Sequence, residues 1–486
     1  TAADLRTRLF IVADDSMRGR LTGSPGMRAT SDYIVRELTR LGVRPAGDNG
    51  TYLARVPVTR DVNAITASAR SAAGAEVAVG STDLGLLSGV GGLPGHPRPS
   101  GEGPVVFGGY MADPGITAAQ ELQPAQLQGA ALVVRYGAVP GTTPTSMRLD
   151  LGRLIGPASP LAALFLVVEG SDLEQAWSYV RSSSGSMKLA SAAGADTTGG
   201  GGPAVFLITP AAAERLTGQP LAGARQPRAG LGTFRYALNR STQQVDAWNV
   251  VGVIPGSDPR RAGEYVAVGA HYDHIGVTDP VNGDSIDNGA DDDGSGTVSV
   301  LEIVERFASL PQARRPARSI LAVWHVGEEE GLLGSEYFTD HPTVARDSIV
   351  AQLNIDMIGR NSPDSLYLVG SRRVSTALGT LVEAANARQA HPFRLDYTFD
   401  APGHPEQIYC RSDHYSYARY GIPVTFFTTG LHPDYHKPSD EPQKIDYDKL
   451  ARVASFIGDA LQDVGNAAAR PKVDQPVPPL GTPCKQ

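Results

Sequence analysis

Two histidines and several carboxylates in the second half of the chain could together form a metal site. Imidazole and carboxylate donors without thiolates suit zinc and related divalent ions. Nearly all of these residues follow a predicted strand or precede a predicted helix, which indicates a metal centre built at strand ends. They lie in five short segments: 269–273 (GAHYD), 290–296 (ADDDGSG), 327–331 (GEEEG), 354–357 (NIDM) and 434–437 (DYHK).

The first of these segments pairs a histidine with an aspartate. His271 follows the apolar run Tyr265 to Ala270, so it lies at the end of a predicted strand. Asp273 points to the same side if the strand continues, and it could accept the second ring N–H of the histidine. Such a carboxylate fixes the tautomer of a metal-bound imidazole. Taken alone, the pair would more simply be part of a surface loop.

The acidic runs exceed what local structure requires. One aspartate of Asp291–Asp293 would cap the helix predicted from Thr297, but three on one turn repel one another unless cations compensate them. Glu328–Glu330 follows the apolar run Ser319–Val326. Adjacent glutamates there could divide the work, one binding a metal and the other taking a proton from metal-bound water.

The remaining polar positions fit the same pattern less strongly. Asp356 closes a strand-like segment, and His436 lies in a loop rich in Pro, Asp and Tyr. Three further aspartates upstream of the triplet form either a solvated acidic loop, which we favour, or a separate calcium site. They are Asp279, Asp284 and Asp287.

The elements that must position these residues alternate between strand and helix from about residue 245. This alternation indicates an α/β sandwich around a mostly parallel sheet, in which active sites lie at the carboxyl ends of the strands. Predicted strands are 250–254, 265–269, 319–326, 352–355, 366–369 and 422–427, and predicted helices are 297–310, 374–389 and 447–464.

The first half of the chain differs in composition and in its pattern of predicted elements. Residues 4–45 predict two helices around a Gly-containing loop, whereas about 60–235 is rich in Gly, Pro and short β-type runs. Residues 182–202 form a low-complexity loop, and the tail after 469 is Pro-rich. The predicted strands of this half are 103–107, 130–136, 163–168 and 204–208.

Composition limits the class of protein. A chain of 486 residues is long enough for two or more domains, and its net charge of −8 argues against nucleic-acid binding. No apolar run approaches the length of a membrane span. Cys410 and Cys484 could form a disulfide or remain free thiols, but two cysteines exclude a Cys-ligated zinc site. The chain opens without Met, and we expect a processed protein that is secreted or periplasmic.

The order and spacing of these motifs resemble the M28 family of di-zinc exopeptidases, and the bacterial leucyl-type aminopeptidases in particular. The resemblance covers about 270–440 and rests on the five segments together with Ser412-Asp413-His414. It implies a zinc-exopeptidase fold of the phosphorylase/hydrolase-like type, with two Zn²⁺ per chain that Co²⁺ or Mn²⁺ could replace. It also implies hydrolysis of peptide substrates by a hydroxide that bridges the metals.

Roles follow from this resemblance position by position. Asp292 would bridge both metals, His271 and Asp356 would complete one site, and Glu329 and His436 would complete the other. Glu328 would be the general base and Asp273 would orient His271. Asp413 would be a structural or supporting residue rather than part of a nucleophile triad, because three contiguous residues cannot adopt triad geometry. Tyr409 and Tyr435 both match positions that hold the oxyanion in family members, and the choice between them stays open.

The 59–240 region resembles a protease-associated (PA) domain, which could shape access to the cleft or be passive. The expected domains are therefore 1–58 (N-terminal helical part of the peptidase), 59–240 (PA-like), 241–469 (catalytic) and 470–486 (tail). An aminopeptidase is the leading hypothesis. A carboxypeptidase or dipeptidase would need cations near the metals, for which Arg360, Arg372, Arg373 and Arg411 are candidates. A glutaminyl cyclase or a non-catalytic receptor-like protein fits the complete ligand set less well.

Overall fold

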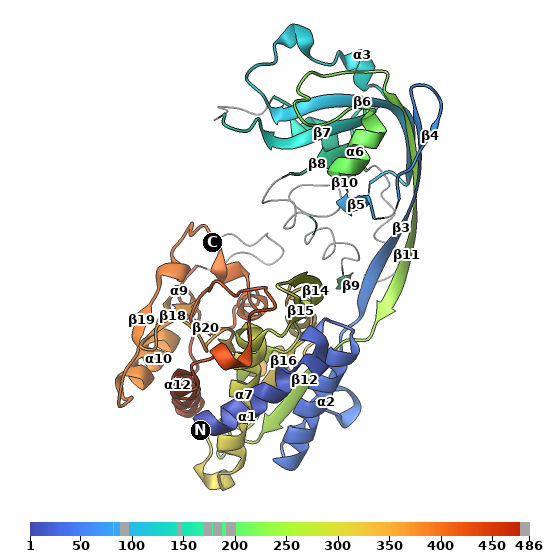
Figure 1. Ribbon diagram of the computed structural model, residues 1–486. Coiled ribbons are helices and arrows are strands. Elements are labelled where there is room, and N and C mark those ends of the chain that lie inside the picture. The colour runs from blue at the N-terminus through green and yellow to red at the C-terminus, as the bar shows by residue number, and fades with distance from the viewer. Residues whose placement is uncertain are drawn as a thin grey trace. The chain divides into compact units, whose positions relative to one another are not determined.

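The chain divides into two units, of which the second is inserted into the first (Figure 1). The computed structural model describes residues 1–80, 82–87, 97–142, 148–169, 177, 187–190 and 201–476. Unit 1 combines Thr1–Val58 with Gln244–Gln486, and unit 2 is Thr59–Gln243.

A nine-stranded sheet forms the centre of unit 1. Its order is β1-β12-β16-β13-β17-β20-β18-β19, with β2 paired to β12. The four adjacent strands β16, β13, β17 and β20 are parallel to one another, which confirms the predicted α/β fold. The strands are β1 (Arg44–Pro45), β2 (Leu53–Arg55), β12 (Trp248–Ile254), β13 (Tyr265–His271), β16 (Ser319–His325), β17 (Ile349–Ile355), β18 (Ser365–Val369), β19 (Arg394–Asp396) and β20 (Val424–Thr428).

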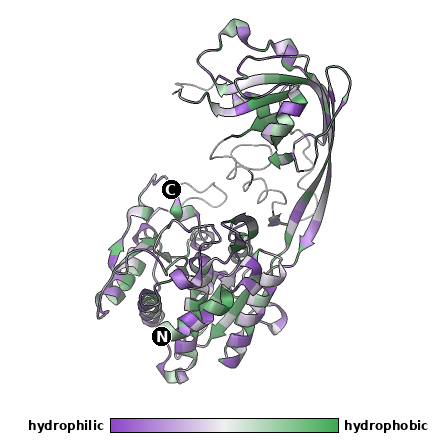
Figure 2. Ribbon diagram, in the orientation of Figure 1, coloured by the Kyte–Doolittle hydropathy of each residue, from purple (hydrophilic) through white to green (hydrophobic). Residues whose placement is uncertain are grey.

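Helices cover both faces of this sheet. Every residue of β16 and β17 is buried. Helices α7 and α12 pack against β13 and β17, whereas Phe338 of α8 and Tyr417 of α11 join Leu321 of β16 in one apolar cluster. In Figure 2 the helices carry both colours, as expected for one buried and one exposed face. The helices of unit 1 are α1 (Ala2–Val12), α2 (Pro25–Arg40), α7 (Gly296–Ala308), α8 (Leu333–Asp340), α9 (Ser371–Val374), α10 (Thr376–Ala387), α11 (His414–Ala418) and α12 (Tyr447–Asn466).

Unit 2 has its own sheet and core. The strand order is β4-β3-β11-β6-β7-β8-β10-β5, with β9 paired to β3. Phe165 and Phe234 meet edge to face in the core with ring centroids 4.7 Å apart. Its elements are β3 (Val58–Ser71), β4 (Glu76–Val77), β5 (Leu84–Leu87), β6 (Ser100–Ala112), β7 (Ala131–Ala138), β8 (Ala163–Val167), β9 (Met187–Leu189), β10 (Ala204–Ile208), β11 (Gly232–Val245), α3 (Pro124–Leu127), α4 (Leu151–Ile155) and α6 (Pro210–Thr217).

Three sequence expectations differ from the structure. The long strands β3 and β11 were not expected, because polar residues interrupt their apolar pattern. The expected acidic loop is instead a hairpin of β14 (Gly276–Val281) and β15 (Asp284–Asp287), in which Asp287 Oδ2 accepts a hydrogen bond from Thr278 Oγ1 at 2.5 Å. Strand β9 lies within the expected low-complexity loop, of which 182–186 and 191–200 fall outside the described residues.

Two further expectations concerned a disulfide between the cysteines and the lack of a membrane span. Cys410 is disulfide-bonded, and Cys484, like the whole tail from 477, lies outside the described residues. In the part of the chain that the structure describes, we find no helix with the length and apolar character needed to cross a membrane.

The two connections to unit 2 are tied together within unit 1. Arg55 of β2 pairs with Trp248 of β12, and the Val56 N–H donates to the Ala247 carbonyl at 2.9 Å. These positions are therefore flanking residues of an antiparallel pair, which a two-residue Asn-Gly turn can close.

We predict that replacing residues 57–246 by Asn-Gly leaves a folded unit 1. The physical reason is that its sheet and apolar clusters lie within the retained segments. The shortened protein should unfold cooperatively in a circular-dichroism melt and should bind divalent metal with the stoichiometry of the full chain. A non-cooperative melt would show that unit 2 is required for folding.

Candidate metal centre

The five sequence-predicted metal ligands come together at the carboxyl edge of the unit 1 sheet. The parallel strands β16, β13 and β17 are neighbours, so their carboxyl ends lie side by side. His271 ends β13, Glu329 follows β16, and Asp356 follows β17. Asp292 lies in the irregular helical turn η4 (Ala290–Ser295) that leads into α7, and His436 lies in the loop after β20.

Asp292 lies between two groups of donors. Its Oδ1 is 3.3 Å from His271 Nε2, which is 3.7 Å from Asp356 Oδ1. Its Oδ2 is 3.1 Å from His436 Nε2, which is 3.0 Å from Glu329 Oε2. Each oxygen of Asp292 therefore faces a different histidine and a different second carboxylate.

These separations fit a pair of divalent cations. Two ligand atoms that each lie about 2.1 Å from a tetrahedral zinc ion are about 3.4 Å apart. His271 Nε2 and Asp356 Oδ1 are buried and have no hydrogen-bond partner among the described residues, as expected of atoms that bind a metal. Distance alone also places Glu328 with His271 and Asp356, and His274 with Asp292 and Glu329. Asp284 and Asp287 belong to neither group.

Burial and mutual repulsion control the charge of these carboxyl groups. Burial raises the pKa of Asp292, but the imidazoles of His271 and His436 outweigh this effect and hold the pKa well below its usual value. Burial and Asp292 raise the pKa of Glu329, but His436 and His274 lower it to about 2.

The pKa of Glu328 is shifted in the opposite direction. Burial raises its pKa well above the usual value; His271 opposes this shift, and Glu329 and Asp356 reinforce it. Positive charge added to the centre lowers the pKa of a neighbouring carboxyl group. Bound cations would therefore favour the ionised form of Glu328.

The other acids of the triplet bind backbone amides. Asp291 Oδ1 accepts from the Gly359 N–H at 2.6 Å, and Asp293 Oδ1 accepts from Gly296 and Met357 at 2.8 and 3.2 Å. The backbone N–H groups of Asp291 and Asp292 donate to Oδ2 of Asp440 at 2.9 and 3.1 Å. These contacts hold the turn that presents Asp292.

Supporting contacts around the ligands differ in detail from expectation. His271 Nδ1 lies 3.2 Å from the backbone carbonyl of Asp273 and 3.8 Å from its Oδ1, while that Oδ1 accepts the Glu328 N–H at 3.3 Å. Burial raises the pKa of Asp413 to about 7. Its neighbour Ser412 makes the contact to a ligand, with Oγ donating to Asp356 Oδ2 at 2.8 Å.

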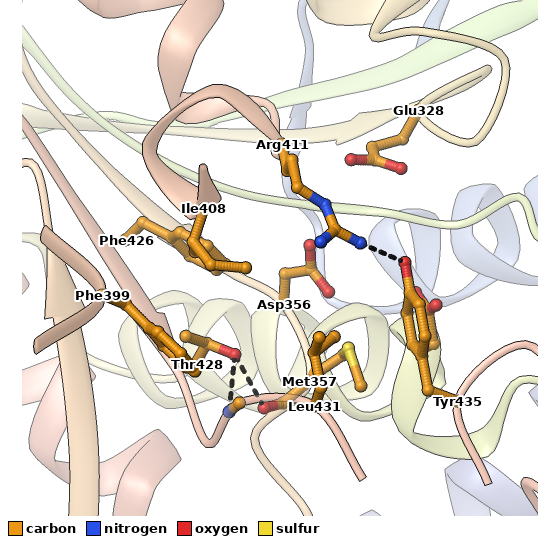
Figure 3. Close-up of a pocket in the computed structure, with 12 residues that line it drawn as sticks. Glu328, Asp356, Met357, Phe399, Ile408, Arg411, Phe426, Thr428, Leu431 and Tyr435 are labelled. Atoms are coloured by element: carbon orange, nitrogen blue, oxygen red, sulfur yellow. Dashed lines mark hydrogen bonds between the residues drawn. The ribbon is translucent and has the colours of Figure 1, made fainter. Parts of the chain in front are cut away.

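A pocket opens beside the centre (Figure 3). Glu328 and Asp356 line one part of it, and Tyr435 stands opposite the apolar wall. The wall and floor are mainly apolar and consist of Met357, Phe399, Ile408, Phe426 and Leu431.

The two candidate tyrosines occupy different environments. Tyr435 lines the pocket. Tyr409 is buried in the apolar cluster of the sheet, where the Arg373 guanidinium lies 4.0 Å from its ring centroid. Tyr435 is therefore the tyrosine that lies within reach of a molecule in the pocket.

Of the four candidate cations, Arg411 lines the pocket. Its Nη2 donates to the Tyr435 hydroxyl at 3.1 Å (Figure 3). Its Nη1 donates to Glu406 Oε2 at 3.1 Å. The other three are engaged elsewhere: Arg360 with Asp434, Arg372 with Glu383, and Arg373 with Asp400 and Tyr409.

Sequence reasoning missed two residues of the site. Arg20, at the end of η1 (Asp15–Arg20), is fully buried, and its guanidinium donates to the carbonyls of Tyr272, Asn288 and Gly289 at 2.9, 2.6 and 2.9 Å. It therefore connects the segment after His271 with the segment before Asp292. His274 is also buried, with Nδ1 2.6 Å from Glu329 Oε1. Its position three residues after His271 was the feature of the sequence that could have identified it as part of the site.

Known proteins are similar to this chain in sequence and in fold. Leucine aminopeptidase 1 of Trichophyton rubrum is 29% identical over 248 residues, which are 49% of this chain and 61% of that protein. A probable leucine aminopeptidase of Arthroderma benhamiae is 30% identical over 216 residues, or 43% of this chain and 55% of that protein. The chain thus spans less than two thirds of the length of these curated relatives.

Solved structures with this fold cover nearly the whole chain. An aminopeptidase from Aneurinibacillus sp. strain AM-1 aligns with a TM-score of 0.55 and 17% identity, covering 100% of this chain and 98% of that one. BSAP, a zinc aminopeptidase from Bacillus subtilis, has the same TM-score and identity over 97% of this chain and 98% of its own. Residues 249–461, which contain all five converging residues, match the profile of peptidase family M28. The chain therefore carries a peptidase domain of family M28.

Proposed function

We propose that the protein is an aminopeptidase that uses two zinc ions. The position of Asp292 between His271 with Asp356 and His436 with Glu329 is the observation that carries this proposal. The names of the related aminopeptidases agree with it. Bound zinc would supply Lewis-acid activation of a water molecule and of the scissile carbonyl.

The protein side chains would then move the protons and hold the substrate. Glu328 lines the pocket, and its backbone is fixed through Asp273. As general base it would take a proton from the attacking water and deliver it to the leaving amine. The Tyr435 hydroxyl, oriented by Arg411, would donate a hydrogen bond to the oxyanion.

The pocket favours an aminopeptidase for apolar N-terminal residues. Its apolar wall would receive the side chain of such a residue. Arg411 favours a second candidate, a carboxypeptidase or dipeptidase, because a guanidinium in the pocket could bind a substrate carboxylate.

A substrate panel separates these candidates. We predict cleavage of leucine and phenylalanine p-nitroanilides, with loss of activity after chelation and recovery with zinc. N-blocked peptides with a free carboxylate serve as the comparison, and liberated amines are measured by mass spectrometry. Cleavage of the blocked peptides without cleavage of the anilides would reject the aminopeptidase.

The proposed centre also predicts a metal requirement for stability. The carboxylates of Asp292, Glu329 and Asp356 are buried close together, so bound cations should stabilise the fold. At about 1,000 times its Kd, zinc should add about 4 kcal/mol to the free energy of unfolding for each site that it fills. The stabilisation is measured by melting curves recorded with chelator and with zinc. Metal analysis should find two ions per chain. An unchanged melting temperature would contradict it.

Glu328→Gln tests the general base. We predict a fall in kcat of about 10²–10⁴-fold with metal content unchanged, because the predicted ligands are kept. Glu330→Gln, two residues on and outside both donor groups, is the matched control and should retain activity. Steady-state kinetics and metal analysis provide the measurement, and full activity in Glu328→Gln would remove Glu328 from this role.

We also propose that unit 2 is a PA-like insert and that the protein works in an oxidising compartment outside the cytosol. The parallel strands β6, β7, β8 and β10 with their own apolar core support an independent inserted module. The disulfide-bonded Cys410 supports the compartment, because disulfides persist in secreted and periplasmic proteins.

A further inference from the structure

The buried imidazole of His274 lies behind the carboxylate of Glu329. His274 Nδ1 is 2.6 Å from Glu329 Oε1, and the other oxygen, Oε2, is 3.0 Å from His436 Nε2. The Glu329 carboxylate is thus placed between two histidines, with one oxygen toward each. Only the Oε2 side faces the nitrogen of a proposed metal ligand.

The distances distinguish a hydrogen-bond partner from a sixth ligand. The predicted ligand atoms lie 3.0 to 3.7 Å from one another, close to the separation of about 3.4 Å expected around tetrahedral zinc. The 2.6 Å between His274 and Glu329 is instead a charge-assisted hydrogen-bond distance. His274 Nδ1 is also 3.9 Å from Asp292 Oδ2.

The proton of this hydrogen bond belongs on Nδ1. The carboxylate can only accept, and His274 Nε2 is buried with no hydrogen-bond partner among the described residues. A proton on Nδ1 gives the imidazole N–H a partner in the Glu329 carboxylate, whereas a proton on Nε2 would have none among the described residues. His274 therefore donates to Glu329.

The backbone around His274 is shaped to hold its ring. A Cβ added to Gly289 would lie 2.5 Å from Cδ2 and 2.6 Å from Cγ of His274, so the ring requires glycine at this position. The backbone N–H of His274 donates to the carbonyl of Arg20 at 3.3 Å. The imidazole is thus fixed by packing as well as by its hydrogen bond.

From this arrangement we propose that His274 is a positioning residue that presents Glu329 to one of the two metals. This inference rests on the proposed metallopeptidase centre and adds to it a supporting residue specific to one site. The hydrogen bond holds Oε1 away from the centre and aims Oε2 at it. Loss of such a partner typically weakens metal binding 10- to 100-fold.

Two substitutions at position 274 distinguish the loss of the hydrogen-bond donor from the loss of the imidazole ring. In His274→Asn the amide nitrogen can occupy the place of Nδ1, so the donor to Glu329 is kept. In His274→Leu a side chain of related shape has no donor. Both variants are first made metal-free, and their melting temperatures are compared with that of the metal-free parent protein.

Zinc affinity is then measured by competition with a chromogenic chelator, and the visible spectrum of the Co²⁺-loaded protein reports the geometry of each site. We expect His274→Leu to weaken one of the two metals 10- to 100-fold and to change the Co²⁺ spectrum, while His274→Asn stays within about threefold of the parent. Unchanged affinity in His274→Leu would overturn the proposal. Equal weakening in both variants would also overturn it, because it would make His274 itself a ligand or a packing residue. If the parent protein binds fewer than two metals, the proposed function fails instead.

Discussion

The accumulation of buried carboxylates at one edge of the sheet is the constraint on which unit 1 depends. Asp292 lies beside both His271 and His436, whereas Asp356 lies beside His271 and Glu329 beside His436. The side chains of these three acids are at most 11% exposed. Charges that leave water cost several kcal/mol each unless opposite charge compensates them. Two imidazoles cannot neutralise these three carboxylates and Glu328 as well. Bound cations would supply the missing positive charge. Burial, Glu329 and Asp356 raise the pKa of Glu328, which reflects the same excess of negative charge.

Three further acids near the centre bind backbone amides. Asp291 and Asp293 each accept backbone N–H groups, and Asp440 accepts two from the turn that carries Asp292. These amides solvate carboxylates that would otherwise compete for the metal or repel the ligands. The acidic excess in the sequence is thus divided between a few groups that face the centre and others that build the turn around it.

The parts of this arrangement that sequence predicts are those with local signals. Apolar runs mark β13, β16 and β17, so His271, Glu329 and Asp356 are expected at neighbouring strand ends, and the strands are found there. Arg20 has no such signal, because its contacts with the metal-site segments are made with carbonyls more than 250 positions away. The hydrogen bond between His274 and Glu329 cannot be predicted from sequence, because it depends on the orientation of the Glu329 carboxylate, which is set by packing in the folded protein. Apolar patterning also does not reveal strands that contain many polar residues, and β3 and β11 were missed for this reason.

The segment before the insertion is a working part of the centre. Thr22 Oγ1 donates to Asp273 Oδ2 at 3.3 Å, and Asp273 Oδ1 accepts the backbone N–H of Glu328 at 3.3 Å. Arg20, two residues before Thr22, fixes the turns on either side of Asp292 and His271. The segment that matches the peptidase family begins only at residue 249, so these contacts come from outside it. Unit 2 enters the chain between β2 and β12, which pair with each other in the unit 1 sheet. The insertion therefore leaves the segment that carries Arg20 and Thr22 joined to the sheet that carries the metal-site residues.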